Sequence, residues 1–167
     1  MYDELTEVDI RKMEEEIEYR ESVLGPKLLA EMSRTREFGD LSENAEYKEA
    51  KREKRKNEGR IRYLKNMIRT AKLIDVKKED GVVALFDIVN IYNEKLEKEK
   101  KVQIVTTLRQ NALLGYVSKE SPLGMAILGR RVGERVLVKV SDTVSYYVKI
   151  LSVEHAEDNE ELPISSY

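Results

Sequence analysis

The first seventy-five residues constrain the fold most, because they are rich in strong helix formers and contain only three glycines and one proline. Apolar residues recur there at offsets of three, four and seven, first at Ile10, Met13, Ile17 and Leu24, then at Leu28, Leu29 and Met32. A second stripe follows at Ile61, Leu64, Ile68 and Ala71. The spacing predicts two helical arms that pair through an apolar seam, with Pro26 kinking or interrupting the first arm.

The seam weakens where the two arms meet in the sequence. Stepped back from Ile61, the pattern reaches mostly polar or small residues, at Asn57, Lys54, Ala50 and Tyr47. An arm of about 30 residues is on the order of 45 Å long at roughly 1.5 Å per residue, more than a compact domain of this size would cover. The arms are therefore expected to project, tightly paired at their base and loosely paired at their tip.

Two carboxylates mark the bend between the arms. The segment from Arg36 to Tyr47 reads R-E-F-G-D-L-S-E-N-A-E-Y and contains Asp40 and Glu43. One interpretation is a capping box, in which Asp40 caps the second helix and Glu43 reaches back to the cap residue. The other is that a projecting arm carries both acids into the active site of another macromolecule. The local sequence allows both.

Charge is balanced overall but unevenly distributed. The chain has 30 basic and 32 acidic residues, so no net field favours nucleic acid. Residues 51–62, however, contain seven basic side chains against two acids, including the patch Lys51, Arg52, Lys54, Arg55 and Lys56. The patch is either a solvated face that pairs with acids on the facing arm or a surface that contacts phosphates.

Several classes of function are excluded or disfavoured by composition. The absence of cysteine removes disulfides, thiolate metal sites and cysteine nucleophiles. No apolar run approaches the roughly 18 residues of a membrane span, and residues 1–9 lack the order of a signal peptide. We expect a soluble cytoplasmic protein without a membrane partner.

The pattern changes after residue 77 to β-rich runs at 82–92, 101–108, 134–140 and 144–153. Ser121-Pro122 begins a short helix that Gly129 ends. One helix on an antiparallel sheet of four or five strands gives an α+β domain. The expected organisation is a helical hairpin over 1–75 with an acidic tip near 39–44, an α+β domain over 80–155, and an acidic flexible tail over 156–167.

Motifs along nearly the whole chain resemble one family. The run Gly39-Asp40-Leu41-Ser42-Glu43-Asn44-Ala45-Glu46-Tyr47 is similar to the tip signature of the bacterial transcript cleavage factors GreA and GreB. Further similarity lies in Glu58-Gly59-Arg60-Ile61, Leu73-Ile74-Asp75, Ser121-Pro122-Leu123-Gly124 and Leu128-Gly129-Arg130. Leu41 is typical of the GreA type, whereas Ser42 and the basic return arm lean towards GreB, so the chain is interpreted as GreA-like.

The resemblance implies an N-terminal antiparallel coiled coil and a C-terminal domain like the FKBP prolyl isomerases. It implies a monomer that docks on the rim of the RNA polymerase secondary channel, with docking residues at Ser121, Pro122, Leu123 and Gly124. Asp40 and Glu43 would help hold a second Mg²⁺ ion there and stimulate the polymerase's own cleavage of backtracked RNA. The chain would then be no enzyme itself, would hold Mg²⁺ only within the complex, and would face the nascent RNA 3′ segment with its basic patch.

Other functions stay open. A non-cleaving regulator could use the same channel, and a coiled-coil module or prolyl isomerase could act without polymerase. The sequence also departs from the family pattern at residues 109–114, in the Lys- and Glu-rich stretch 94–101, and in a tail beyond Glu154 that is longer than expected. These departures bear on the docking surface, not on the tip.

Overall fold

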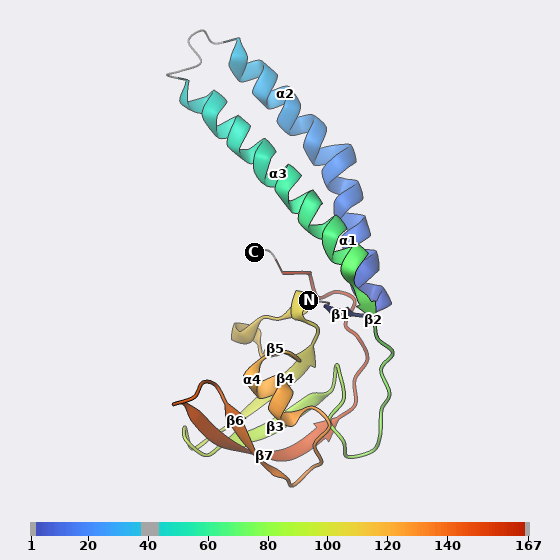
Figure 1. Ribbon diagram of the computed structural model, residues 1–167, viewed down its shortest axis with the longest axis vertical. Helices are drawn as coiled ribbons and strands as arrows, with labels where there is room; N and C mark the ends of the chain where they lie inside the picture. The colour runs from blue at the N-terminus through green and yellow to red at the C-terminus, as the bar shows by residue number, and fades with distance from the viewer. Residues whose placement is uncertain (1–2, 38–43, 166–167) are drawn as a thin grey trace. The chain divides into compact units, whose positions relative to one another are not determined.

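The computed structural model describes residues 3–37 and 44–165, which belong to two compact units (Figure 1). The first unit is mainly helical and contains Asp3 and residues 9–72, and the second contains residues 4–8 and the chain from residue 73 onwards. The first arm consists of α1 (Glu7–Tyr19), the π-helical segment η1 (Arg20–Leu24) and α2 (Gly25–Arg36). The return arm is the single helix α3 (Ala45–Thr70).

The predicted interruption at Pro26 is confirmed, as a π segment rather than a break. The backbone N–H of Gly25 donates to the carbonyl of Arg20, five residues earlier, and Tyr19, Leu24 and Gly25 all keep helical dihedrals. Pro26 lies in the first turn of α2, where its missing N–H costs least. The wider π turn lets the helix pass Pro26 without ending.

The seam between the arms is only partly the one predicted. Met13, Ile17 and Leu64 are buried as expected, and Ala50 is buried near the tip. Leu29 is 50% exposed, and the buried positions of α3 include Arg60 and Met67, which lay outside the predicted pattern, as well as Asn57, one of its polar positions. Since Asn57 and Arg60 are polar, the middle of the seam depends on hydrogen bonds as well as on apolar contact.

The second unit contains a five-stranded sheet in the order β5-β4-β3-β7-β6. The strands are β3 (Ile88–Asn93), β4 (Lys98–Val105), β5 (Tyr116–Ser118), β6 (Arg135–Lys139) and β7 (Ser145–Glu154). The sheet was expected to be antiparallel, but β5 pairs parallel to β4. The chain between them passes through two short 3-10 helices, η2 (Thr107–Arg109) and η3 (Ala112–Leu114), and so returns in the same direction. A separate pair, β1 (Glu4–Leu5) and β2 (Lys72–Leu73), makes a two-stranded sheet.

One face of the large sheet carries the core, and a short helix packs beside it. Helix α4 (Pro122–Ile127) contributes Ile127, and Gly129 follows with φ +78°, as predicted for a helix end. Its fully buried partners come from β3, β4, β6 and β7 and include Val89, Ile91, Ile104, Val138, Val148 and Ile150. Turns after Asn93 and at Ser141-Asp142 connect β3 to β4 and β6 to β7.

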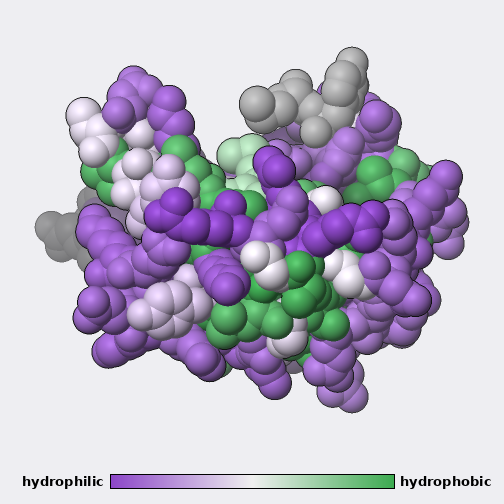
Figure 2. Space-filling model, turned by 90° about the horizontal axis from the view of Figure 1, so that it is seen from below, coloured by the Kyte–Doolittle hydropathy of each residue, from purple (hydrophilic) through white to green (hydrophobic). Residues whose placement is uncertain are grey.

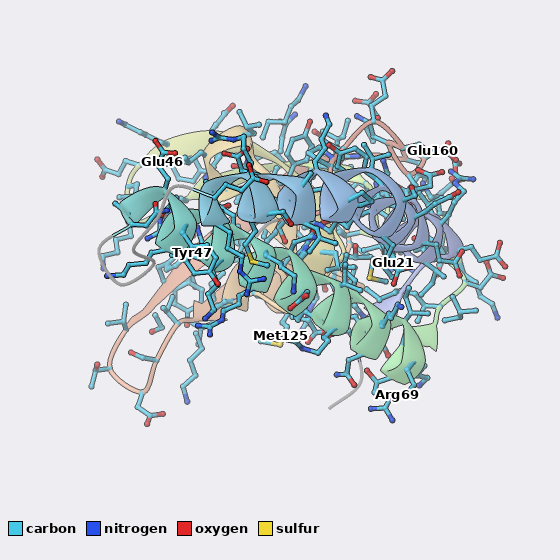
Figure 3. The ribbon with its side chains drawn as sticks, turned by 90° about the horizontal axis from the view of Figure 1, so that it is seen from above. Glu21, Glu46, Tyr47, Arg69, Met125 and Glu160 are labelled. Atoms are coloured by element: carbon cyan, nitrogen blue, oxygen red, sulfur yellow. The ribbon has the colours of Figure 1, made fainter. Side chains whose placement is uncertain are left out.

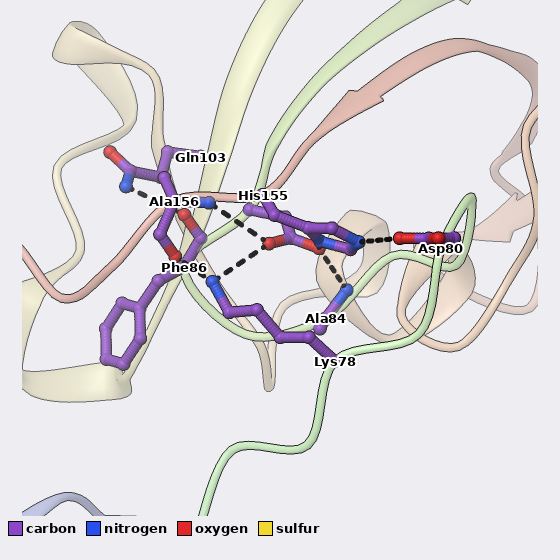
Figure 4. Close-up of polar contacts among 8 residues, drawn as sticks. Lys78, Asp80, Ala84, Phe86, Gln103, His155 and Ala156 are labelled. Carbon is purple, nitrogen blue, oxygen red and sulfur yellow. Dashed lines mark hydrogen bonds and ion pairs between the residues drawn. The ribbon is translucent and has the colours of Figure 1, made fainter.

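Residues 82–87 were expected to begin a strand but form a buried turn. Phe86 has φ +70°, which is incompatible with a regular strand, and its neighbour Asp87 has a fully buried side chain. The Asp87 carboxylate accepts hydrogen bonds from the Ala84 N–H at 2.8 Å and from the Ala156 N–H at 3.4 Å, and lies 2.8 Å from His155 Nδ1 (Figure 4). His155 therefore helps join the end of β7 to this turn.

The segment after residue 156, expected to be flexible, makes specific contacts with the second unit. Arg109 is 2% exposed, and its guanidinium donates to the Asp158 carboxylate at 2.8 Å and to the Asn159 carbonyl at 2.9 Å. The Ser165 N–H donates to the Leu108 carbonyl at 2.5 Å. Two departures from the family pattern, at 109–114 and in the tail, thus occupy one structural feature.

We predict that Arg109→Ala releases this segment. Removing the guanidinium leaves Asp158 without its main cationic partner, and breaking a buried pair from one side costs up to about 3–5 kcal/mol. Limited proteolysis followed by mass spectrometry should show cleavage after residue 156 at least tenfold faster than in the wild type. Arg130→Ala, at an exposed arginine of the same unit, is the control. Equal cleavage rates in Arg109→Ala and wild type would contradict the anchoring role.

The face drawn in Figure 2 is mostly hydrophilic, with exposed apolar regions between. On the sheet face opposite the core, Leu137 pairs across strands with Tyr147, and Arg135 stacks on the Tyr147 ring at 3.5 Å from its centroid. Leu113 and Leu114 of η3 are 98% and 70% exposed. None of the helices among the described residues is both long enough and apolar enough to cross a membrane.

Candidate functional site

The two arms end beside each other at the tip of the first unit. Asn44 is the N-cap of α3, and its Oδ1 accepts a hydrogen bond from the Tyr47 N–H at 3.0 Å. Its Nδ2 donates to the carbonyl of Thr35 in α2 at 2.7 Å, and Thr35 is fully buried. One side chain thus starts the return arm and ties it to the first arm. Asp40 and Glu43 lie outside the described residues, in the segment 38–43 that joins these two ends.

The capping-box interpretation of the two acids is wrong for α3. The helix begins at Ala45 and its cap is Asn44, four residues after Asp40. The sequence misled because Asp and Asn are equally good caps, and the Asp40–Glu43 spacing matches the capping motif. The role of capping α3, which would have explained both acids, belongs to another residue.

Tyr47 follows in the first turn of α3 (Figure 3). Its ring is half-buried, and the guanidinium of Arg36 in α2 lies 5.9 Å from the ring centroid. Arg34 of α2 also lies 3.6 Å from the exposed carboxylate of Glu46. Through the contact with Arg36, Tyr47 helps pack the two arms together near their ends.

The predicted basic patch lies on α3, and its ion pairs stay within that helix. Arg52 pairs with Glu49 at 2.7 Å, Lys54 with Glu58 at 2.5 Å, and Lys56 with Glu53 at 2.9 Å. The expectation that these cations pair with acids of the facing arm is therefore wrong for these three. The hydrogen bonds from Lys54 and Lys56 hold the pKa values of Glu58 and Glu53 below the ordinary range.

The remaining two residues of the patch belong to a longer exposed row, the basic stripe. Its members follow helical spacing on the side of α3 away from the seam, and they are Lys48, Lys51, Arg55, Arg62 and Arg69. Among the described residues, no side-chain hydrogen bond or ion pair involves Lys51 or Arg55, and both residues are exposed. The charged groups at the ends of these two side chains are thus accessible to an anion.

A polar cluster, the seam cluster, occupies the middle of the paired arms. Glu16 of α1 accepts from Arg60 of α3 at 2.9 and 3.2 Å and from Arg20 at 2.7 Å. Burial alone would raise the pKa of Glu16, but the hydrogen bonds from Arg60 and Arg20 and their positive charge outweigh it and hold the pKa below the ordinary value of 4.5. The carboxylate is therefore kept ionised in the folded arms.

We predict that this cluster makes the arms sensitive to acid. Because the folded pKa of Glu16 is depressed, its contribution to stability is complete above the ordinary pKa and is lost as pH falls through the folded value. Thermal unfolding followed by helical circular dichroism should show the wild-type midpoint falling between about pH 5 and pH 3 more steeply than that of Glu16→Gln. Other carboxylates contribute equally to both proteins, so parallel curves would contradict the prediction.

The predicted docking residues have clear roles in the fold. Ser121 caps α4, accepting from the Gly124 N–H at 3.0 Å and donating to the Ser118 carbonyl at 2.7 Å. Gly124 is buried, and a Cβ there would lie 2.1 Å from the Ser118 carbonyl oxygen. Pro122 occupies the first turn, and Leu123 packs on the core. The most exposed side chain of α4 is Met125, at 61%.

The described residues contain no group of three or more His, Asp or Glu side chains arranged to hold a metal ion. The two tip acids supply hard oxygen ligands, which suit Mg²⁺. Two carboxylates are too few to complete its six-coordinate shell.

Comparison with known proteins identifies both halves of the chain. Residues 4–73 match the model of the transcription elongation factor N-terminal domain, and residues 78–155 match that of the GreA/GreB C-terminal domain. A protein of Thermoanaerobacter pseudethanolicus named transcription elongation factor GreA is 40% identical over 139 residues, covering 81% of this chain and 87% of that protein. A Clostridium botulinum protein of the same name is 35% identical over 153 residues, covering 91% and 95%.

Solved structures with a similar chain trace include Gfh1, a GreA factor homologue of Thermus thermophilus, with 21% identity and a TM-score of 0.42 over 93% of this chain and 100% of that one. Another is a GreA/GreB elongation factor of Nitrosomonas europaea, with 21% identity and a TM-score of 0.40 over 58% and 80%. The domain matches and the curated relatives carry the assignment. This chain belongs to the GreA/GreB family of transcription elongation factors.

Proposed function

We propose that this protein is an elongation factor that binds bacterial RNA polymerase and stimulates cleavage of the 3′ end of backtracked nascent RNA. The observation that carries the proposal is the membership of the GreA/GreB family together with both tip acids, Asp40 and Glu43. The capping of α3 by Asn44 supports it, because the role of capping that helix is then not needed to explain Asp40. The protein stimulates the polymerase's own activity and acts in the cytoplasm.

In the proposed mechanism, each of the two units has a role of its own in bringing the tip acids to the polymerase. The arms work as an antiparallel coiled-coil hairpin that enters the secondary channel, and the second unit has an FKBP-like fold that docks at the channel rim. Ser121 and Gly124 would shape the docking surface through the α4 cap rather than touch polymerase themselves. Pro122 and Leu123, with the exposed Met125, offer contact area beside them.

The chemistry at the tip follows from the charge of the two acids. Asp40 and Glu43 would contribute carboxylate oxygens to a second Mg²⁺ ion within the polymerase complex. When bound, such an ion activates an attacking water and stabilises the leaving oxygen of a phosphodiester. The chain needs no nucleophile or proton-transferring group of its own, because its acids supply negative charge and position.

The proposal is tested with a defined backtracked elongation complex in Mg²⁺, with and without the protein. RNA cleavage is followed on a gel while polymerase binding is measured in parallel by mobility shift. Faster cleavage with binding supports the proposed function. Binding with unchanged or slower cleavage would instead identify a non-cleaving regulator of the channel, and absence of binding would refute the polymerase partner.

We predict that Lys51→Ala with Arg55→Ala weakens stimulation without affecting the fold. Both side chains are exposed members of the basic stripe near the tip, where they would contact RNA phosphates and position the 3′ segment. The loss should be roughly three- to tenfold at sub-saturating factor and should shrink as salt is raised, because the contacts are electrostatic. Arg62→Ala with Arg69→Ala, on the same stripe but farther from the tip, is the control. Equal losses in both pairs would contradict a local RNA contact.

A further inference from the structure

The seam cluster lies where paired helices usually bury apolar side chains. Its members are Glu16 and Arg20 on the first arm and Asn57 and Arg60 on the return arm. Asn57 is 4% exposed and Arg60 is 7% exposed, so both are removed from water. Burying such groups is costly unless their partners are correctly placed.

In this cluster, each arm donates hydrogen bonds to acceptors on the other. Arg60 grips Glu16 with two nitrogens, Nε at 2.9 Å and Nη2 at 3.2 Å. Arg20 donates to Asn57 Oδ1 at 3.0 Å, and Asn57 Nδ2 donates back to the Arg20 carbonyl at 3.2 Å. A forked guanidinium contact and a reciprocal amide contact both require a particular alignment.

The cluster also contacts the π-helical segment of the first arm directly. The Arg20 carbonyl that binds Asn57 is the same one that accepts the π-type hydrogen bond from Gly25. A Cβ at Gly25 would lie 3.7 Å from Asn57 Nδ2. Asn57 therefore contacts the first arm at the π segment.

Other alignments of the arms would lose these contacts. A slip of seven residues, about 10 Å at 1.5 Å per residue, could bring Asn57 level with Met13 and leave its amide against an apolar side chain. Apolar seams tolerate such slips better, and a buried polar residue fixes register at a cost in stability.

We propose that Glu16, Arg20, Asn57 and Arg60 form a register lock that fixes how far one arm lies along the other, and that they are positioning residues for the tip. The register decides where α2 ends relative to the start of α3, and therefore how the segment with Asp40 and Glu43 is presented. The consequence for cleavage rests on the proposed function, whereas the register itself does not.

The test replaces the lock with apolar residues in the full chain, as Glu16→Leu/Asn57→Leu/Arg60→Met. Because the chain has no cysteine, Ala30→Cys and Glu49→Cys place spin labels only on exposed sites of α2 and α3. Pulsed electron paramagnetic resonance then reads the spacing of the arms without any activity. We expect one narrow distance distribution in the wild type, and a shifted or broadened one in the variant despite an unchanged or higher melting temperature.

Stimulation of RNA cleavage by the unlabelled variant should fall by about 10- to 100-fold, with polymerase binding retained, because small misplacements of reacting groups are costly. Glu21→Gln/Lys65→Gln is the matched control, since it removes a cross-arm ion pair of 2.5 Å whose side chains are about half exposed. It should leave both the distances and the stimulation unchanged.

A wild-type distance distribution in the apolar variant would overturn the lock. A broadened distribution with full stimulation would overturn its role in positioning. If the variant loses its helical signal, Asn57→Leu alone carries the same test. If the wild-type protein does not stimulate cleavage, the proposed function fails, while the distances still decide whether the lock exists.

Discussion

Replacing Asp40 by Asn together with Glu43 by Gln is expected to abolish stimulation of RNA cleavage while leaving polymerase binding intact. Both changes keep side-chain size and remove only negative charge, so the variant tests metal positioning rather than shape. Loss of one group that stabilises charge in a transition state typically costs about 10²–10³-fold, and the tip would lose two such groups. The measurement is the single-turnover cleavage rate in a backtracked complex at saturating factor.

The variant has a natural control at the next acid along the chain. Glu46 lies in the first turn of α3, its carboxylate is 66% exposed, and it lies near Arg34. Glu46→Gln should retain wild-type stimulation, because the negative charge of Glu46 in the first turn of α3 interacts with the helix dipole and with Arg34. If both variants lose activity equally, general negative charge at the tip is responsible. If neither does, Asp40 and Glu43 have no part in cleavage.

The parts of the fold that depend on local sequence were predictable. Helical spacing predicted both arms, and Pro26 predicted the interruption that became the π segment, because each depends on residues within one or two turns. The short helix after Ser121 followed from its cap and its closing glycine in the same way. The strand β5 was missed because three residues are too few to show an alternating pattern.

The candidate site was less accessible to sequence reasoning where contacts are long-range. The pairs Arg60–Glu16 and Arg109–Asp158 join residues 44 and 49 positions apart, and no local pattern indicates them. Asn44 could have been found, since it stands three residues before Tyr47 at the start of a helical pattern and Asn is a strong cap. Asp40 was predicted as the cap instead, because the Asp40–Glu43 spacing matches the capping-box motif.

These misses share a physical cause. Patterns of apolar residues indicate which face of an element is buried. They do not indicate which polar groups are buried because they form hydrogen bonds with one another. In this protein such groups occur at the seam cluster, at the Asn44 bridge between the arms, and at the Arg109 anchor of the C-terminal segment. Each of them joins two segments that are far apart in the sequence through hydrogen bonds, which a pattern of apolar residues does not report.

Asp87→Ala is expected to destabilise the second unit more than any surface substitution. The Asp87 carboxylate is fully buried and accepts hydrogen bonds from the Ala84 and Ala156 N–H groups. It also contacts the His155 ring, and the Lys78 ammonium lies 3.4 Å from it (Figure 4). Truncation leaves these groups without their acceptor, and we expect a loss of about 3–5 kcal/mol in the free energy of unfolding. For a unit of this size the unfolding midpoint should fall by on the order of 15 °C.

The matched control is Asp80→Ala, because Asp80 is fully exposed and lies 4.0 Å from the other nitrogen of the same His155 ring. That variant should stay within about 0.5 kcal/mol of wild type. Asp87→Asn separates charge from hydrogen bonding: its oxygen can still accept from Ala84, so an intermediate loss is expected. Similar midpoints for Asp87→Ala and Asp80→Ala would mean that the buried carboxylate does not hold the turn at 82–87 to the end of β7. If the second unit docks on polymerase, as proposed, the destabilised protein should also bind it less well, while the helical arms keep their signal because they belong to a separate compact unit.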